Sequence, residues 1–270
     1  MKTGFSARWF ALACVVLNVV FNYASELLLP LPSMRSMSDR YATFFTPAPY
    51  AFSIWGVIYL GLLTYAIAAV LPKYRTVALF DRLSYPLAVT NLLASVWVVA
   101  FRADRIDVSV VVVLGMLLLS GHMFWRAHHA ARNREAAFRL TVPFALLFGW
   151  VTVATLANLG AYGVFLGGLD SPTAAPSTAV AFMIIAVLAA SAVVFRTHDF
   201  VYPAVVTWAL VAIAAEQWST TVVATAAGFG AALCAVLATY SAYARGKRPR
   251  FRHTTRNGTP AHRRQLESYI

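Results

Sequence analysis

The residues that most strongly suggest chemistry are three aromatics that follow a proline-broken loop. Pro47 lies in that loop, and the apolar segment directly after it carries Phe52, Trp55 and Tyr59. On a helix these aromatics fall at positions i, i+3 and i+7, so they share one face. A stiff loop above an aromatic helical face is typical of the entrance to a pocket for an apolar small molecule.

A polar stripe lies within the first apolar run of the chain. Asn18, Asn22 and Glu26 are spaced four residues apart, which places them on one side of a helix. Polar groups are costly in lipid, so this stripe is expected to face other helices or a water-filled cavity. Two interpretations stay open: part of a ligand or ion path, or hydrogen bonds that hold helices together.

Further candidate residues lie on two later apolar runs. On the fifth run an aromatic, a small residue and an amide recur every four positions, as Trp150, Ala154 and Asn158. The third run carries Asn91 and Trp97. Such a mixture suits either close contact between helices or the wall of a shaped pocket.

No catalytic or metal-binding motif accompanies these residues. The sequence has no Walker loop, dinucleotide-binding glycine pattern, HExxH or GxSxG. His128 and His129 are adjacent, point to different sides of a helix and lack a cysteine or carboxylate at ligand spacing, so we expect a solvated interfacial cluster. We therefore predict binding or transport, with no enzyme activity, no metal and no cofactor.

Composition places these residues in a membrane protein. Of the 270 residues, 60% are hydrophobic and 12% are charged, and the mean hydropathy is +0.68. A soluble domain is about half apolar and about one quarter charged. Both cysteines lie inside apolar runs, which indicates small core residues and not a disulfide framework.

The fold class predicted from hydropathy is an all-α integral membrane protein with eight transmembrane helices. A spanning helix needs about 20 mostly apolar residues. The eight candidate spans are 9–29, 49–71, 85–101, 107–125, 141–164, 177–195, 200–216 and 219–243.

The basic residues predict the orientation of these spans. With the N-terminus in the cytoplasm, 18 of the 22 Lys and Arg residues fall on the inner side and 4 on the outer side. Both termini are then cytoplasmic, and the Pro47 loop faces outward. We expect a bacterial or archaeal plasma membrane. The net charge of +12 follows from this topology, so nucleic acid is not an expected partner.

The chain divides into three predicted parts. Residues 1–166 hold five spans, and residues 167–243 form a three-helix extension behind a loop rich in glycine and proline. Residues 244–270 form a basic tail without apolar periodicity, which we expect to be disordered and drawn to acidic lipid headgroups.

The loop and the two later runs resemble the translocator protein family, also called TspO, tryptophan-rich sensory protein or peripheral benzodiazepine receptor. That family has a proline-rich loop entering its second helix, which Pro47, Phe52, Trp55 and Tyr59 match. Its third helix carries an Asn and a Trp, matched by Asn91 and Trp97. Its fifth helix has a proline-aromatic pair, then Trp, Ala and Asn at spacing four. The matching residues are Pro143, Phe144, Trp150, Ala154 and Asn158.

The resemblance covers residues 9–164 and implies a five-helix bundle around a ligand pocket. In that family the pocket binds porphyrins, haem, sterols and benzodiazepine-type ligands. Trp55, Trp97, Trp150 and Ala154 would line it here, with Asn158 beside them. The loop ahead of Pro47 lacks the tryptophan that members often carry, so binding is expected and not porphyrin breakdown.

The resemblance and the small residues also set expectations about partners. The expected ligand is a small hydrophobic planar molecule that is sensed or carried. The alternative is an ion- or proton-coupled secondary transporter that uses the Asn18/Asn22/Glu26 stripe. Small residues on the fifth and eighth spans would permit a homodimer. They are Gly149, Ala154, Gly228 and Ala232.

Overall fold

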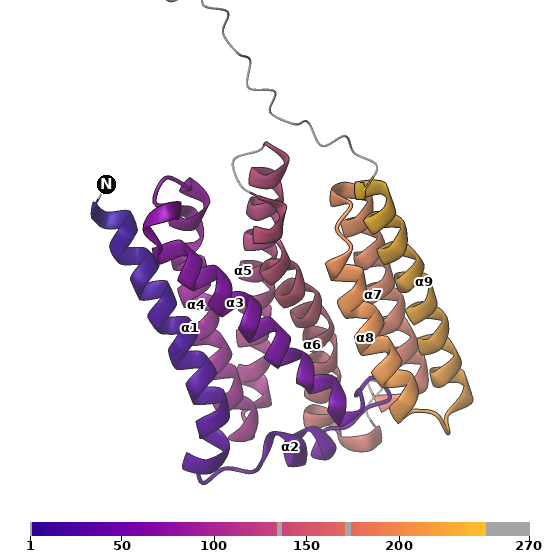
Figure 1. The fold of residues 1–270 in the computed structure, drawn as a ribbon. Helices are drawn as coiled ribbons and strands as arrows, with labels where there is room; N and C mark the ends of the chain where they lie inside the picture. The colour runs from indigo at the N-terminus through magenta and orange to yellow at the C-terminus, as the bar shows by residue number, and fades with distance from the viewer. Residues whose placement is uncertain (1, 134–136, 171–173, 247–270) are drawn as a thin grey trace, which may run out of the picture.

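The computed structural model describes residues 2–133, 137–170 and 174–246, and within these residues the protein is helical, with no strand. Figure 1 shows long helices standing side by side and one short helix lying across one end of the bundle. The short helix is α2 (Met34–Arg40). The long helices are α1 (Lys2–Leu28), α3 (Ile54–Val70), α4 (Ala78–Arg102), α5 (Ile106–Arg132), α6 (Val142–Gly167), α7 (Pro176–Thr197), α8 (Val201–Glu216) and α9 (Thr221–Gly246).

These eight long helices occupy the eight predicted spans. Seven of them are long and apolar enough to cross a membrane, while α8 is shorter. With 16 residues, α8 is about 24 Å long, against a hydrocarbon core of about 30 Å. It stands beside α7 and α9 and runs along the same course (Figure 1). The protein is thus an all-α, multi-pass integral membrane protein, as predicted, with one helix shorter than a full span.

The N-terminus and the end of α9 lie at the same end of the bundle (Figure 1). This matches the even number of passes that the distribution of basic residues predicts. We call this the inner end, and the end that carries α2 the outer end. Most of the predicted basic tail, residues 247–270, lies outside the described residues.

At the inner end, a buried arginine ties α1 to the turn between α3 and α4. Arg8 is 2% exposed, and its Nε donates to Asp81 Oδ1 at 2.7 Å. Its other nitrogens donate to the carbonyl of Ala69 in the last turn of α3, at 3.0 Å, and to the carbonyl of Tyr74 in the connection to α4, at 3.1 Å. This anchoring explains why α4 begins at Ala78 and not near residue 85 as hydropathy alone predicts.

Of the last three helices, α8 packs directly on α6, and α9 packs on α7 and α8. A Cβ added at Gly149 would lie 3.1 Å from the Cβ of Val205 and 3.3 Å from the carbonyl oxygen of Tyr202. A Cβ here would make its neighbours on α8 shift by a few tenths of an ångström, so glycine lets α6 and α8 pack closely at this position. Gly149 is thus not available to a homodimer, whereas Gly228 and Ala232 are exposed on α9.

Candidate functional site: an aromatic pocket below the proline loop

The proline loop is held in place by its own turn and by α8. Thr46 Oγ1 accepts from the Thr43 amide at 2.9 Å, and the Thr46 amide donates to Thr43 O at 3.0 Å. The loop then enters a 3₁₀ turn at Pro49–Ser53, which leads into α3. Trp208 of α8 donates its indole N–H to the carbonyl of Ala51 in this turn at 3.1 Å. The loop is therefore a fixed part of the pocket and not a free connection.

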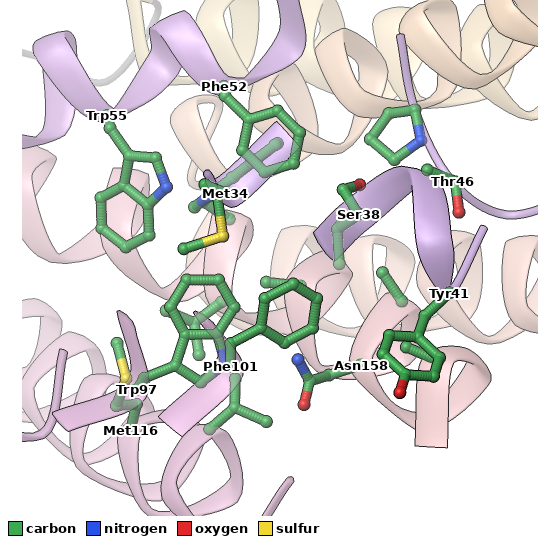
Figure 2. A pocket seen from close by; sticks show the side chains of 18 residues that line it. Met34, Ser38, Tyr41, Thr46, Phe52, Trp55, Trp97, Phe101, Met116 and Asn158 are labelled. Carbon is green, nitrogen blue, oxygen red and sulfur yellow. The ribbon is translucent and has the colours of Figure 1, made fainter. Parts of the chain in front are cut away.

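Aromatic side chains from three helical segments form the walls of the pocket. Phe52 meets Trp150 of α6 edge-on, with 6.0 Å between ring centroids. On α4, Trp97 stacks on Phe101 at 5.4 Å. Figure 2 shows Phe52 and Trp55 on one side of the pocket and Trp97 and Phe101 on the other. Two aromatic faces opposite each other suit a flat apolar ligand.

The short helix α2 closes the outer side of this pocket. Its N-cap is Ser33, whose side chain accepts from the backbone N–H of Ser36. Met34, Ser38 and Tyr41 contribute the lining residues from this segment. Hydropathy alone predicts only a loop ahead of Pro47, although apolar Met34, Met37 and Tyr41 have the i, i+3, i+7 spacing of a helix.

Tyr41 fastens the end of α2 to the turn after α4. Its hydroxyl donates to Asp104 Oδ1 at 2.5 Å, and Arg40 forms an ion pair with the same carboxylate at 3.0 Å. Burial, the hydrogen bond and the nearby carboxylate raise the pKa of the Tyr41 phenol, while Arg40 opposes the shift. The phenol therefore remains a hydrogen-bond donor at neutral pH.

The pocket has two connected chambers. The deeper chamber is an aromatic slot of about 70 Å³. The other chamber is a vestibule of about 520 Å³. The slot is mostly apolar, whereas polar residues such as Asn22, Glu26 and Gln217 line the vestibule. Residues that line both chambers form the passage between them. They are Met34, Ser38, Thr46, Pro47, Phe52, Trp55 and Trp97.

Asn158 supplies a polar group on the wall of the slot. It is 3% exposed, and its Oδ1 accepts from Ser109 Oγ at 2.8 Å. That bond fixes the amide so that its nitrogen is directed into the pocket (Figure 2). The indole N–H of Trp97, another lining residue, has no acceptor among the described residues. A ligand acceptor group would satisfy either donor.

Seven of the residues named from the sequence lie around this pocket, and three do not. The seven are Pro47, Phe52, Trp55, Trp97, Trp150, Ala154 and Asn158.

The three outside it are Tyr59, Asn91 and Phe144. Tyr59 stacks behind Trp55 at 5.3 Å, and Phe144 is buried against Tyr65 at 4.7 Å. Asn91 points toward α1. Asn91 and Phe144 each stand six residues before a pocket tryptophan, a rotation of about 240° on a helix, which turns them away.

The polar stripe of α1 divides between two environments. Asn18 is buried and donates to Asn91 Oδ1 at 3.0 Å, and its Oδ1 accepts from Asn22 at 2.8 Å and from Ser95 at 2.9 Å. Glu26 instead accepts from the backbone N–H of Met34 at 3.0 Å. Asn18 therefore holds α1 to α4, whereas Asn22 and Glu26 reach the vestibule.

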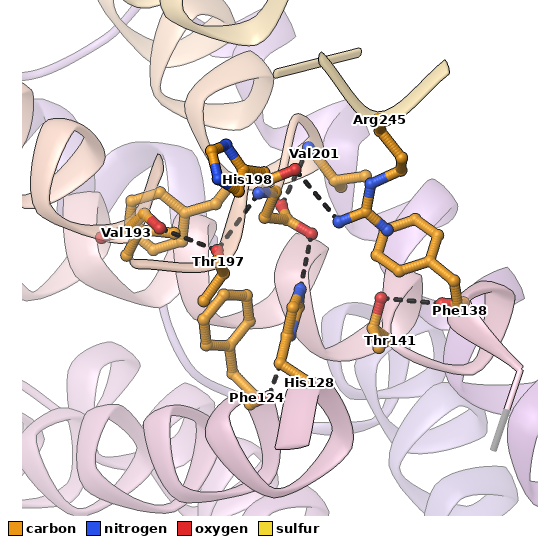
Figure 3. Close-up of polar contacts among 11 residues, drawn as sticks. Phe124, His128, Phe138, Thr141, Val193, Thr197, His198, Val201 and Arg245 are labelled. Atoms are coloured by element: carbon orange, nitrogen blue, oxygen red, sulfur yellow. Dashed lines mark hydrogen bonds and ion pairs between the residues drawn. The ribbon is translucent and has the colours of Figure 1, made fainter. Parts of the chain in front are cut away.

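The expectation of a solvated histidine cluster is wrong for His128. That side chain is buried, at 9% exposed, while its neighbour His129 is exposed. His128 contacts Asp199, which lies 71 positions later in the chain (Figure 3), so their spacing in the sequence gives no sign of the contact. Within the described ranges, no three His, Cys, Asp or Glu side chains gather as a metal site requires.

Comparison with known proteins agrees with the resemblance seen in the sequence. A family model described as TSPO-like protein matches residues 8–240. No curated protein and no solved structure matches the chain significantly. The family match runs through α7, α8 and most of α9, so it covers the three C-terminal helices as well as the first five. The chain therefore belongs to the TSPO-like family.

Proposed function

We propose that this protein is a membrane receptor that binds a hydrophobic, planar small molecule of the porphyrin, haem or isoprenoid kind, in order to sense or carry it. The observation that carries this proposal is the aromatic slot that opens into a polar vestibule. Phe52 and Trp150 supply one aromatic contact to the ligand, and Trp97 with Phe101 supplies the opposite face. We propose binding without turnover.

The volumes of the two chambers indicate how such a ligand sits. Pockets for drug-sized ligands are about 300–1,000 Å³, so the slot of about 70 Å³ holds one edge or ring and not a whole macrocycle. The vestibule of about 520 Å³ is large enough for the remainder. The ligand then has an apolar edge between the aromatics and polar substituents toward Asn22 and Glu26.

The test is a titration of the purified protein with a porphyrin, read by the change in porphyrin absorbance. Trp55→Ala and Trp97→Ala remove walls shared by both chambers, so each is expected to weaken binding at least tenfold. Trp9→Ala is the matched control, because Trp9 is half exposed at the inner end of α1. If Trp55→Ala and Trp97→Ala bind like the control, the pocket assignment is wrong.

The second candidate function is an ion- or proton-coupled secondary transporter. It is favoured by Asn22 and Glu26, which line the vestibule while the stripe continues inward to Asn18. Uptake into proteoliposomes with and without a pH gradient separates the two functions. Gradient-driven uptake that survives Glu26→Gln would rule out a role for this stripe in coupling.

The distribution of basic residues also supports an orientation in the membrane. We place the protein in a bacterial or archaeal plasma membrane, with both termini in the cytoplasm and the vestibule on the outer side. Alkylation of single cysteines introduced at Arg35 and at Arg196, with a membrane-impermeant reagent, tests this orientation. The cysteine at position 35 is expected to react in intact cells, and the one at position 196 only after lysis.

A further inference from the structure

The vestibule of the pocket is lined by more negative than positive side chains. Its walls carry three carboxylates, from Glu26, Asp39 and Glu216, and one guanidinium, from Arg35. Glu216 is the last residue of α8, so the C-terminal helices contribute a charge to the mouth of the pocket. A ligand whose apolar edge lies in the slot has its polar end among these charges.

The ion pairs of the outer end show which vestibule carboxylate lacks a counter-ion. Among the described residues, this end carries six carboxylates and four arginines (Figure 1). Each arginine pairs with a different carboxylate: Arg35 with Asp39 at 3.8 Å, Arg40 with Asp104 at 3.0 Å, Arg102 with Glu26 at 3.8 Å and Arg105 with Asp107 at 2.9 Å. The two carboxylates that remain belong to Asp170 and Glu216.

These two remaining carboxylates differ in their position relative to the pocket. Both side chains are exposed. Asp170 ends the 3₁₀ turn Gly168–Asp170 after α6 and lines neither chamber. Glu216 lines the vestibule. The vestibule therefore has one negative charge that the described part of the chain does not pair, and this charge comes from Glu216.

The position of Glu216 is unfavourable for α8 itself. The C-terminal end of a helix carries a partial negative charge, which favours cations there and disfavours carboxylates. The Glu216 side chain forms no hydrogen bond or ion pair with another described residue, so it does not fasten α8 to its neighbours. A bound cation would supply the partner that this carboxylate lacks.

The aromatic walls of the passage favour the same sign of charge. Trp55 and Trp97 line both chambers and lie on opposite sides of the pocket (Figure 2). The face of an indole attracts a cation through the ring quadrupole and gives no such attraction to a carboxylate. A cationic group in the vestibule is thus favoured by the tryptophans as well as by Glu216.

We propose that the pocket selects planar ligands whose polar end is cationic, such as protonated or quaternary aromatic amines, and that Glu216 sets this preference. The inference rests on the receptor function proposed above and narrows its class of ligand. The apolar edge of the ligand enters the slot, where Trp97 and Asn158 offer N–H donors, and the cation stays in the vestibule. A carboxylate at that end of the ligand would instead face Glu216 without a counter-ion.

The test compares two porphyrins that differ in one substituent, an N-methylpyridinium in one and a benzoate in the other. Each is titrated into the full chain in non-ionic detergent at low ionic strength, and the ratio of the two Kd values reports the charge preference. The wild type is expected to bind the cationic porphyrin about two- to fivefold more tightly, the range expected for interactions between exposed charges. Glu216→Gln should lose most of this preference. Asp170→Asn is the matched control, because it removes the other unpaired outer carboxylate, and it should keep the wild-type ratio.

Two further readouts separate an electrostatic role of Glu216 from a structural one. Raising the ionic strength from about 0.05 M to about 0.5 M should shrink the wild-type preference, because salt screens exposed charges, and should change Glu216→Gln little. The Tm of Glu216→Gln should equal or exceed that of the wild type, since the substitution removes a carboxylate from the negative end of α8.

Equal binding of the two porphyrins by the wild type, or tighter binding of the anionic one, overturns the proposal. So does a ratio for Glu216→Gln that matches the wild type. An equal loss of preference in Asp170→Asn also overturns it, since the preference would then belong to the outer face as a whole. Failure of the receptor function itself looks different: neither porphyrin binds to the wild type, and this inference falls with it.

Discussion

The ring of Phe52 meets the indole of Trp150 edge-on, with 6.0 Å between centroids, and so joins the 3₁₀ turn that precedes α3 to the first half of α6 across the pocket. Phe52 is partly buried and Trp150 is 3% exposed. Trp150 therefore both packs the core and lines the slot. A test of ligand binding must separate these two roles.

Trp150→Phe is expected to weaken porphyrin binding while preserving the fold. An aromatic pair contributes about 0.5–1.5 kcal/mol beyond its buried area, so the affinity should fall roughly twofold to tenfold. Trp150→Ala would instead cost about 3–5 kcal/mol of folding stability. The measurement is an absorbance titration together with a Tm for each variant. Unchanged affinity in Trp150→Phe, and also in Phe52→Leu, would contradict the aromatic clamp.

Asn158 is expected to select ligands that carry a hydrogen-bond acceptor. Asn158→Leu keeps the volume of the side chain but removes the amide that faces the slot. A net hydrogen bond is worth about 1 kcal/mol, so acceptor-bearing ligands should bind about fivefold more weakly. Purely hydrocarbon ligands should bind as before. Ser109→Ala removes the partner of the amide oxygen and leaves the amide nitrogen in place, so equal losses in both variants would argue against direct contact.

Tyr41→Phe is expected to speed ligand release, because it removes one of the two contacts between the end of α2 and Asp104, leaving only the Arg40 ion pair, while keeping the aromatic ring. The raised pKa of Tyr41 also sets a sign for pH dependence. A phenol that gives up its proton only above its ordinary pKa of about 10 holds α2 through neutral and mildly alkaline pH. Dissociation from the wild type should therefore accelerate only above that range. Stopped-flow release measured against pH checks this, and Tyr41→Phe should show a fast rate without the alkaline rise.

The sequence predicts the helices well because in lipid each backbone N–H and C=O must be satisfied within a helix, so hydropathy alone locates the spans. It does not predict α2, which is too short to give a hydropathy signal and depends on the Ser33 cap. Nor does it pair His128 with Asp199, because the two are brought together only when α8 packs on α6. Trp150, Ala154 and Asn158 are four residues apart on α6, so the sequence could predict that they share the pocket. It could not place Asn91 and Phe144 there, since each stands six residues before a pocket tryptophan.

Asn18→Leu is expected to destabilise the protein by about 1–2 kcal/mol, because it leaves the polar groups of Asn91 and Ser95 without their partner between α1 and α4. A double-mutant cycle with Asn91→Leu should show coupling between the two positions, since their side chains are 3.0 Å apart. Asn22→Leu, on the vestibule side, is the comparison. Additive effects of Asn18→Leu and Asn91→Leu on the free energy of unfolding would mean that this bond does not hold the helices.

Gly149 tests whether the C-terminal helices must pack on α6. A Cβ at this position would approach Val205 to 3.1 Å, closer than most real contacts. Gly149→Ala should therefore force α6 and α8 apart and lower the free energy of unfolding by about 1–3 kcal/mol, in spite of the better helix propensity of alanine. Val205→Ala removes only the Cγ1 contact at 3.2 Å and leaves the Val205 Cβ and the Tyr202 carbonyl in place, so the double variant should recover only a small part of this loss. Gly228→Ala is the matched control, since a Cβ there meets nothing within 4 Å. The Tm of all four proteins decides the matter: if Gly149→Ala is as stable as Gly228→Ala, α6 and α8 are not held at the distance that a glycine requires.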